Sequence, residues 1–380
     1  MMNKPTFRTA SKLLFYALLI LLILTGCSTL SSVDESAAIE YEASSATIVQ
    51  TAPPTLQEYV EGLSKDEIAT LNSLEQVDDY PLYTMRYHGE YDQQSVSMIE
   101  NRAMWEHIQL NLPTMEQPAW ACSLFAALGE DEDMQFGRNF DWEYSPALLL
   151  FTQPQGGYTS VSMVDIAYLG FGGARAHGLT ERPLKERGAL LDTPYLPFDG
   201  MNEHGLAVGM AAVPSGEMKS KPSKETIGSL MVIRNMLDYA RNVDEAIAIL
   251  GSYNIDFEGG PAIHYLIADP SGRAALVEFY QGEMIVIPNK EPWHQATNFL
   301  RAEAGESPEG RCWRYDRISE RLSASRGKLT AQEAMELLAD VSQEETQWSI
   351  VYGISESGVN VVMGRNYRQV PTYQLGNPDG

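Results

Sequence analysis

The chain has 380 residues, and 27 Lys and Arg residues face 51 Asp and Glu residues, which gives a formal net charge of −24. Hydrophobic residues make up 44% and charged residues 21%, the proportions of an ordinary globular protein. Such an acidic chain is a poor candidate for nucleic-acid binding, because phosphate backbones are bound by Lys and Arg. Its three cysteines are too few for a dense disulfide framework.

The N-terminus carries a targeting signal. Three basic residues precede an unbroken apolar run from Leu13 to Leu24, which is shorter than the roughly 20 residues of a membrane span and typical of a signal peptide. Leu24-Thr25-Gly26-Cys27 resembles the lipobox of bacterial lipoproteins. We therefore expect residues 1–26 to be removed and Cys27 to be lipidated, which anchors an exported protein to the outer face of the bacterial cell membrane. A plain secretory signal or a short anchor with an incidental cysteine is the alternative.

Two further segments precede the part of the chain that is rich in strands. Residues 27–53 are dominated by Ser, Ala, Glu and Thr and end at a proline pair, which predicts a flexible tether. From Leu56 to Leu74 apolar residues recur every three or four positions, and a second helical pattern covers residues 95–109, with a short extended piece at 82–87. Residues 54–121 are therefore predicted to be a mainly helical segment.

The remaining chain, residues 122–380, alternates runs of strands with runs of helices. This arrangement favours a layered α+β domain over repeated βαβ units. Strands are predicted at residues 121–128, 134–140, 147–152, 158–168, 206–213, 264–268, 274–280, 348–353 and 359–363. Helices are predicted around residues 230–240 and 314–322 and after the capping residues Asn242 and Thr330.

Several common types of site find no support in the sequence. There is no His-Glu-x-x-His motif, and the six histidines are scattered without the spacing of metal ligands. No phosphate-binding Gly-x-x-x-x-Gly-Lys loop occurs, and the segment that starts at Gly353 misses the nucleophile-elbow pattern. We therefore expect neither a metal nor another cofactor.

Cysteine is the informative residue type. Cys122 opens a predicted strand, and Arg138 and Asp141 follow it by a distance that suits one hairpin returning beside that strand. A neighbouring guanidinium stabilises a thiolate, which is the nucleophilic form of cysteine. From these residues alone, a buried structural cysteine, which most lone cysteines are, or a disulfide with Cys312 is also open.

The motifs around these residues resemble those of a known group. Cys122, the block Gly137 to Trp142 and the block Asp199 to Ala207 resemble the choloylglycine hydrolase and penicillin V acylase family, which belongs to the N-terminal-nucleophile (Ntn) hydrolases. Further matches occur, in family order, at residues 264–269, 277–278, 297–298 and 314–317. The segment before Cys122 also resembles the propeptides of acid ceramidase-like and isopenicillin N acyltransferase-like relatives. The resemblance implies a four-layer αββα sandwich that hydrolyses carbon–nitrogen bonds in linear amides.

The resemblance also implies a role for each matching residue. Cys122 would attack the carbonyl carbon of the amide, and Arg138 would flank the thiolate. Asp141 would orient the α-amino group that becomes free when the bond before Cys122 is cut. Asn298 would donate to the oxyanion, and Arg314 would orient the network. An α-amine has a pKa near 7.7–8.0, so it can act as a general base at neutral pH without a histidine.

One departure from the family pattern limits what can be carried over. Ala212 stands where bile-salt hydrolases and penicillin V acylases have Asn or Tyr, and a methyl group cannot donate a hydrogen bond. The preference for bile salts or penicillins therefore does not follow, and the expected partner is a small-molecule N-acyl amide of unspecified structure. Two alternatives stay open: transfer of the acyl group to an amine, and a catalytically inactive surface lipoprotein that binds a ligand.

Overall fold

The computed structural model describes residues 62–91, 121–129, 133–257, 260–305 and 307–376. The predicted signal peptide, the lipobox with Cys27, the tether and the predicted helix at 95–109 lie outside these residues. Within them, none of the helices has both the length and the apolar character that crossing a membrane requires. The described residues fall in one compact unit, Pro54–Gly380.

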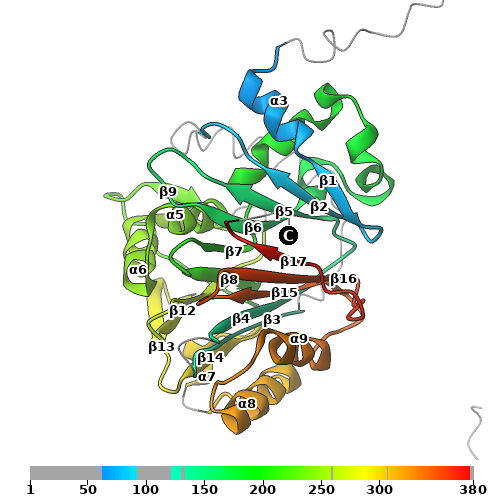
Figure 1. Ribbon diagram of the computed structural model, residues 1–380. Coiled ribbons are helices and arrows are strands. Elements are labelled where there is room, and N and C mark those ends of the chain that lie inside the picture. The colour runs from blue at the N-terminus through cyan, green and yellow to red at the C-terminus, as the bar shows by residue number, and fades with distance from the viewer. Residues whose placement is uncertain (1–61, 92–120, 130–132, 258–259, 306, 377–380) are drawn as a thin grey trace, which may run out of the picture. The chain divides into compact units, whose positions relative to one another are not determined.

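A nine-stranded sheet forms one of the two central layers (Figure 1). Its strands are antiparallel except at the β2–β5 pair, which is parallel. In spatial order they are β1 (Glu75–Asp78), β2 (Leu82–Arg86), β5 (Ala147–Thr152), β6 (Ser160–Asp165), β7 (Asp199–Asn202), β8 (Ala207–Ala212), β11 (Ile263–Ala268), β12 (Ala274–Tyr280) and β13 (Glu283–Pro288).

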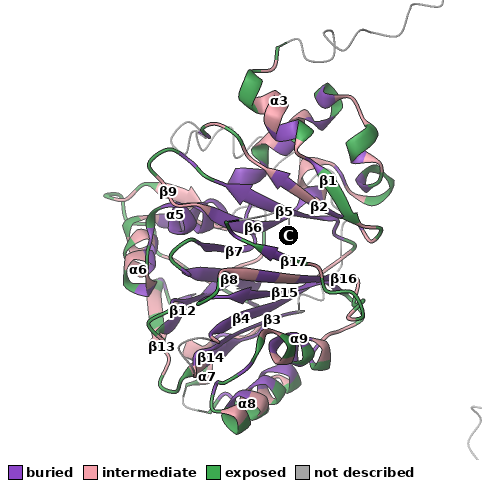
Figure 2. Cartoon of the chain, viewed as in Figure 1, coloured by how far each residue is buried: buried purple, intermediate pink, exposed green. Residues whose placement is uncertain are grey.

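A six-stranded antiparallel sheet forms the second central layer. Its spatial order is β14 (Trp293–Ala296), β3 (Ala121–Ala127), β4 (Gln135–Asp141), β15 (Thr346–Gly353), β16 (Gly358–Met363) and β17 (Thr372–Gln374). Every residue of β3, β4 and β15 with a described side chain is buried, because each strand has a sheet on one side and helices on the other (Figure 2). The two sheets face each other, with β3 packed on β8 and β11.

Helices form the two outer layers. α5 (Met231–Tyr239) and α6 (Val243–Ser252) cover the nine-stranded sheet, whereas α8 (Trp313–Ser325) and α9 (Ala331–Asp340) cover the six-stranded sheet. The order helix, sheet, sheet, helix confirms the predicted αββα sandwich. The shorter elements are α3 (Lys65–Asn72), α7 (Arg301–Ala304), the 3₁₀ helices η1 (Ile166–Leu169), η2 (Gly173–Ala176), η3 (Leu179–Glu181) and η4 (Leu184–Tyr195), and a small parallel pair of β9 (Thr226–Gly228) with β10 (Asn254–Asp256).

Local signals in the sequence account for several element boundaries. The side chain of Asn242 accepts a hydrogen bond from the Glu245 amide at 3.0 Å and caps α6. Thr330 and Glu333 form the reciprocal capping box predicted for α9. The predicted strand at 158–168 is shorter than expected, because Asp165 ends β6 and its side chain accepts from the Ala167 amide to start η1.

Two glycines permit close approaches that set the position of β3. A Cβ atom on Gly137 of β4 would lie 2.4 Å from the Phe125 ring of the paired strand. A Cβ atom on Gly209 of β8 would lie 2.6 Å from a side-chain atom of Leu124. Only glycine leaves room for both β3 side chains, so these positions bring the two sheets together around the strand that carries Cys122.

Residues 62–91 are built into the main sheet. β2 extends the nine-stranded sheet beyond β5, and the Tyr83 hydroxyl donates to the carbonyl of Ala176 at 2.6 Å. The buried Tyr91 hydroxyl lies 3.0 and 3.1 Å from the two carboxylate oxygens of Asp238 at the end of α5. The helix predicted from Leu56 to Leu74 is described from Lys65 to Asn72, and the extended piece predicted at 82–87 is β2. The predicted pro-segment, residues 54–121, thus supplies strands to the sandwich, so the boundary at Cys122 remains a prediction about processing.

Candidate active site

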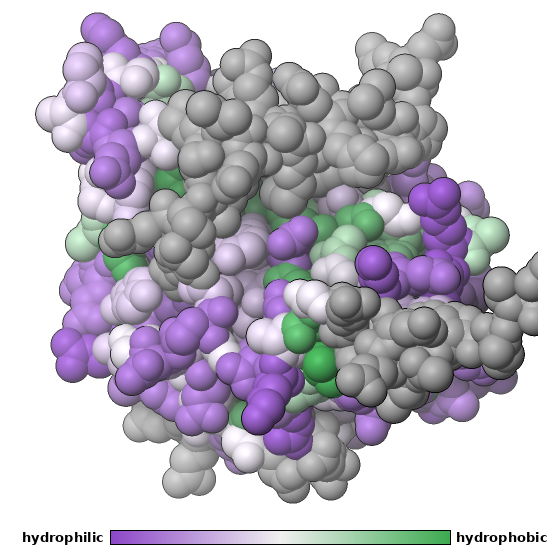
Figure 3. Space-filling model, turned by 90° about the horizontal axis from the view of Figure 1, so that it is seen from above, coloured by the Kyte–Doolittle hydropathy of each residue, from purple (hydrophilic) through white to green (hydrophobic). Residues whose placement is uncertain are grey.

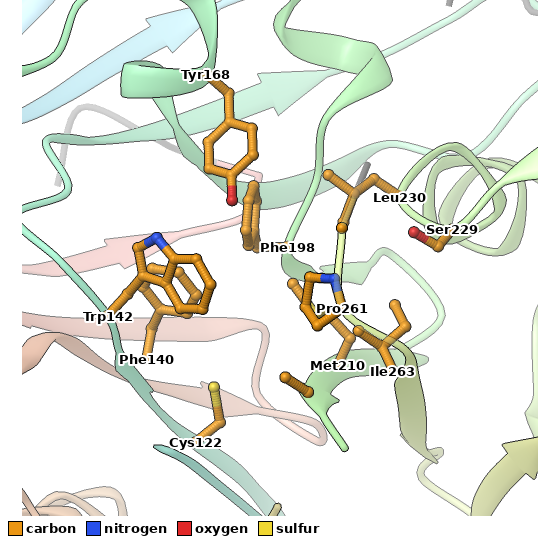
Figure 4. Close-up of a pocket in the computed structure, with 12 residues that line it drawn as sticks. Cys122, Phe140, Trp142, Tyr168, Phe198, Met210, Ser229, Leu230, Pro261 and Ile263 are labelled. Carbon is orange, nitrogen blue, oxygen red and sulfur yellow. The ribbon is translucent and has the colours of Figure 1, made fainter. Parts of the chain in front are cut away.

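Cys122 lies at the start of β3, between β4 and β14 in the six-stranded sheet. Only 3% of Cys122 is exposed, and both Cys122 and Cys312 are free thiols. The alternative of a Cys122–Cys312 disulfide is therefore wrong. In Figure 4 the sulfur points toward the space that Phe140 and Trp142 border on one side and Met210 and Pro261 on the other.

An apolar pocket lies over the thiol. Its empty volume is about 520 Å³, including the part that opens to solvent. None of its lining residues carries a charge, and its polar side chains are limited to the thiol, one indole, one phenol and one serine. The lining residues are Cys122, Phe140, Trp142, Tyr168, Phe198, Met210, Ala212, Ser229, Leu230, Gly260, Pro261 and Ile263. An uncharged, largely apolar group fits this wall, because a charged group would lose hydration without gaining a partner.

Arg138 is one member of a buried network next to Cys122. On β4 it occupies the diagonal position next to Cys122, which is paired directly with Phe140. Its guanidinium donates to one carboxylate oxygen of Asp199, and Tyr352 donates to the other carboxylate oxygen. The side chains of Arg138 and Asp199 are completely buried, and the guanidinium carbon lies 5.0 Å from the centre of the Phe140 ring. This network fixes a positive charge close to the sulfur.

Burial raises the pKa of the Cys122 thiol above its usual value. The positive charge of Arg138 opposes this rise, the Asp141 carboxylate adds to it, and Arg314 opposes it. Arg138 therefore acts in the predicted direction, but the loss of hydration is larger. The thiol therefore needs a base to release its proton at neutral pH.

Asn298 and Arg314 meet at the backbone of Cys122. The backbone nitrogen of Cys122 donates to the Asn298 side-chain oxygen at 2.7 Å. Arg314 donates to the same oxygen at 2.9 Å, to the carbonyl of Cys122 and to the Ser123 hydroxyl at 2.9 Å. The Asn298 amide nitrogen donates to the carbonyl of Ala212 at 2.8 Å. Because an amide nitrogen donates two hydrogen bonds, a second one remains for an oxyanion.

Asp141 is a completely buried carboxylate. Burial raises its pKa to about 6, although hydrogen bonds from Thr346 and Gln343 and the charge of Arg314 lower it. Gln343 donates to Asp141 at 3.1 Å, and Arg314 approaches to 3.8 Å. The structure thus brings Cys122, Asp141, Asn298 and Arg314 together, and Arg138 lies on the same face of the β3–β4 hairpin as Cys122, in the diagonal position.

Sequence reasoning did not assign a role to several residues of this arrangement. Asp199 lies in a block that carried the family resemblance, and Tyr352 lies in a predicted strand, but nothing in the sequence pairs them with Arg138. Gln343, in the loop after α9, and Thr346, the first residue of β15, hold Asp141. Cross-sheet partners of this kind are set by strand order, which one sequence does not reveal. Among the described residues, no group of His, Cys, Asp or Glu side chains is arranged to hold a metal ion.

Comparison with known proteins supports the fold and part of the sequence pattern. The sequence model of the family described as acyl-coenzyme A:6-aminopenicillanic acid acyl-transferase matches residues 197–363. A comparison with curated proteins gave no match.

Three solved structures resemble the chain at low sequence identity. An arginine-to-leucine variant of conjugated bile acid hydrolase from Clostridium perfringens has a TM-score of 0.50 and 17% identity, covering 68% of this chain and 94% of that chain. A cysteine-to-alanine mutant of the same protein has a TM-score of 0.49 and 17% identity, covering 68% of this chain and 94% of that chain. Penicillin V acylase from Agrobacterium tumefaciens has a TM-score of 0.47 and 15% identity, covering 66% of this chain and 85% of that chain. The chain therefore has the predicted Ntn-hydrolase fold. Over residues 197–363 it also matches the sequence pattern of the acyl-transferase family named above.

Proposed function

We propose that this protein is a cysteine-nucleophile hydrolase that cleaves the carbon–nitrogen bond of a linear amide through a thioester. The observation that carries the proposal is the position of Cys122. It is a free thiol at the base of an apolar pocket, and Asn298 and Arg314 are hydrogen-bonded to its own backbone. A nucleophile, an oxyanion donor and a fixed positive charge at one point are what acyl transfer from an amide requires.

The proposed reaction has two steps. The sulfur of Cys122 attacks the amide carbonyl, its proton passes to the free α-amine of the same residue, and Asn298 donates to the oxyanion. The C–N bond then breaks, the leaving amine takes the proton, and a thioester to Cys122 remains. Water attacks the thioester carbonyl in the second step and gives a proton to the α-amine. The C–S bond then breaks, and the α-amine returns that proton to the sulfur. The products are a carboxylic acid and the regenerated thiol.

The α-amine exists only after the bond between Ala121 and Cys122 is cut. We propose that the protein makes this cut itself, since attack of the Cys122 thiol on the preceding carbonyl uses the same donors as turnover. Residues 62–91 would then remain attached as a separate chain, because β2 and Tyr91 are integrated into the fold. Through the lipobox at Cys27, that chain would hold the enzyme on the outer face of the cell membrane.

The pocket supports a substrate with an uncharged, apolar acyl half. The wall here is built from four aromatic side chains and several aliphatic ones, and Ala212 offers only a methyl group and its carbonyl. An aryl-acetyl or medium-length fatty acyl group suits such a wall better than a dicarboxylic acyl group.

A fluorogenic panel tests both the reaction and the acyl preference. Phenylacetyl, decanoyl and succinyl amides of 7-amino-4-methylcoumarin are incubated with the purified protein and with two matched variants, Cys122→Ala and Cys312→Ser. We expect hydrolysis of the two apolar amides, no activity in Cys122→Ala and full activity in Cys312→Ser. Protein denatured during turnover should carry the acyl group on Cys122, which peptide mass spectrometry detects as added mass. Hydrolysis that survives Cys122→Ala would overturn the proposal, and product formed only when an acceptor amine is added would identify an acyltransferase.

A further inference from the structure

A buried carboxylate lies directly behind the loop that carries Asn298. Glu278 on β12 is completely buried and accepts three hydrogen bonds. Two come from the first backbone amides of α7, Arg301 at 2.8 Å and Ala302 at 2.7 Å. The third comes from the ring of His264 on β11, whose Nδ1 lies 3.0 Å from the carboxylate. The sequence singled out His264 and Glu278 as family-like, and the reaction proposed above gives neither of them a role.

These contacts fix one end of the loop that carries Asn298. The loop begins where β14 ends at Ala296, and Ala296 is held by its pairing with Leu124 on the nucleophile's own strand. It ends at Leu300, the N-cap of α7, whose side chain offers no capping hydrogen bond. α7 is only four residues long, so its own hydrogen bonds do little to hold its start. The two bonds to Glu278 replace the missing cap three residues after Asn298.

The same sheet also holds the other side of the Asn298 amide. In β11, His264 pairs with Ala211 of β8, and the next pair is Ile263 with Ala212. The carbonyl of Ala212 accepts from the Asn298 amide nitrogen at 2.8 Å. The backbone beside His264 therefore fixes the amide itself, while the carboxylate bonded to His264 fixes the chain that follows it.

The charge of Glu278 suits this position. Burial would raise its pKa, but the hydrogen bonds from His264 and from the Ala302 and Arg301 amides outweigh burial and lower the pKa below its usual value. Burial lowers the pKa of the neighbouring His294 to about 4, so that ring is neutral at neutral pH. Glu278 is thus an anion at neutral pH, with His264 and two amide dipoles as its hydrogen-bonding partners.

We propose that Glu278, oriented by His264, is a positioning residue that places Asn298 for oxyanion stabilisation. Glu278 acts only through the backbone at Arg301 and Ala302. The inference rests on the proposed amide-bond reaction, in which Asn298 is the oxyanion donor. A displacement of about 1 Å in such a donor can lower a rate about 100-fold, and loss of the whole donor costs about 10²–10³-fold in kcat.

The test is Glu278→Gln in the full-length protein, with Glu283→Gln on the exposed neighbouring strand as the matched control. A glutamine nitrogen cannot accept a hydrogen bond, so one of the two amides loses its partner. We expect kcat for the phenylacetyl amide to fall about 10- to 100-fold with little change in KM. Alkylation of Cys122 by iodoacetamide forms no oxyanion, so its rate should stay within about twofold. Glu283→Gln should match the wild type in both assays.

A double-variant cycle separates positioning from general damage to the fold. If Glu278 acts through Asn298, then Glu278→Gln combined with Asn298→Ala is no slower than Asn298→Ala alone. The inference would be overturned if the rate losses of the two single variants multiplied in the double variant, or if Glu278→Gln kept the wild-type kcat. If Glu278→Gln does not fold, His264→Ala keeps both backbone bonds and removes only the orienting ring, and the same cycle applies.

Hydrogen exchange of the amides at Arg301 and Ala302 keeps the two claims distinguishable. Exchange should be faster in Glu278→Gln than in the wild type, whether or not an amide substrate is known. Absence of turnover by the wild type would count against the proposed function. Unchanged exchange in the variant would count against the role of Glu278.

Discussion

Removing either charge of the Arg138–Asp199 pair should shift the pKa of the Cys122 thiol, and the two removals should shift it in opposite directions. Arg138→Leu removes the positive charge that opposes the effect of burial, so the pKa should rise further. Asp199→Asn removes the carboxylate that neutralises this guanidinium and leaves Arg138 in place, so the pKa should fall. Opposite signs from two members of one buried pair are a signature that damage to the fold does not reproduce.

The magnitude follows from the burial of the pair. An opposite charge within about 4–6 Å of a titrating group moves its pKa by about 1–3 units, and Asp199 reduces the effect, so we expect about one to two units in each direction. One unit corresponds to about 1.4 kcal/mol of thiolate stabilisation. At a pH well below the pKa, Arg138→Leu should therefore lower the alkylation rate about tenfold or more.

The assay is the pH dependence of iodoacetamide alkylation at Cys122, measured by peptide mass in a Cys312→Ser background. Tyr352→Phe is the matched control, because it removes one hydrogen bond to Asp199 and leaves both charges in place. Arg138→Leu leaves a buried carboxylate without its cation and should cost about 3–5 kcal/mol of unfolding free energy. Arg138→Leu combined with Asp199→Asn should recover part of this loss. Folded variants whose alkylation profiles move the same way, or do not move, would refute the reasoning.

Four further predictions concern folding, maturation and anchoring. Burial raises the pKa of Asp165 to about 7 from 3.8. The stability that the protonated carboxyl gives the folded state is therefore fully present below pH 3.8 and is lost as the pH rises through 7. Asp165→Asn should raise the unfolding free energy at pH 8 by up to about 4 kcal/mol and by little at pH 4, as denaturant titrations at both values can verify. Intact mass should reveal a fragment that begins at Cys122, absent in Cys122→Ala; an uncut chain with full activity would exclude the amine-base mechanism. Cys27→Ser should release the protein from the detergent phase, whereas a wild-type protein found wholly in the aqueous phase would contradict the lipoprotein prediction. Gly137→Ala should destabilise the fold by about 1–3 kcal/mol through overpacking, whereas Gly188→Ala, with no atom within 4 Å of its Cβ position, should be neutral in thermal melts.

The sequence predicted the strands of the sandwich better than their order. β3, β4, β5, β8, β11, β12, β15 and β16 all lie within about two residues of the predicted runs, because each is apolar and bounded by turn residues. β1 is a four-residue polar strand without such a signal and was not predicted. β13 does contain an apolar run, Met284 to Ile287, between Gly282 and Pro288, but it was not predicted either. Their pairing also depends on neighbours that are remote in sequence, such as β2 beside β5.

The sequence could predict which candidate site residues lie close together where those residues belong to one local motif. Cys122 and Arg138 belong to one hairpin, so their proximity follows from local pairing of β3 with β4. Asn298 and Arg314 lie about 180 residues further along the chain, and only the family resemblance brought them to the site. Asp199 shows the limit of such reasoning: its block was recognised, but its contact with Arg138 crosses from one sheet to the other. The apolar pocket was likewise unpredictable, since its wall combines side chains from both sheets and the intervening loops.

The surface adds little to the choice of substrate. On the face shown in Figure 3, hydrophilic residues form most of the described margin, and hydrophobic residues gather toward the middle. The net charge of −24 makes an anionic substrate unfavourable at long range. The uncharged wall around Cys122 makes it unfavourable at short range as well. Both effects agree with the neutral acyl amide proposed above as substrate.

In the proposed reaction, the hydrogen bond between the Cys122 nitrogen and Asn298 would link maturation to catalysis. In an uncut chain this nitrogen is an amide, which donates one proton to the Asn298 oxygen at 2.7 Å and has no basic lone pair. A free amine at the same position keeps a proton for Asn298 and gains a lone pair that can accept the thiol proton. Because Arg314 fixes the same oxygen at 2.9 Å, Asn298 is held in one orientation, with its nitrogen directed at Ala212 and available to the oxyanion. One amide can therefore hold the base and stabilise the oxyanion at once, which requires the loop that carries Asn298 to be held as firmly as Glu278 holds it.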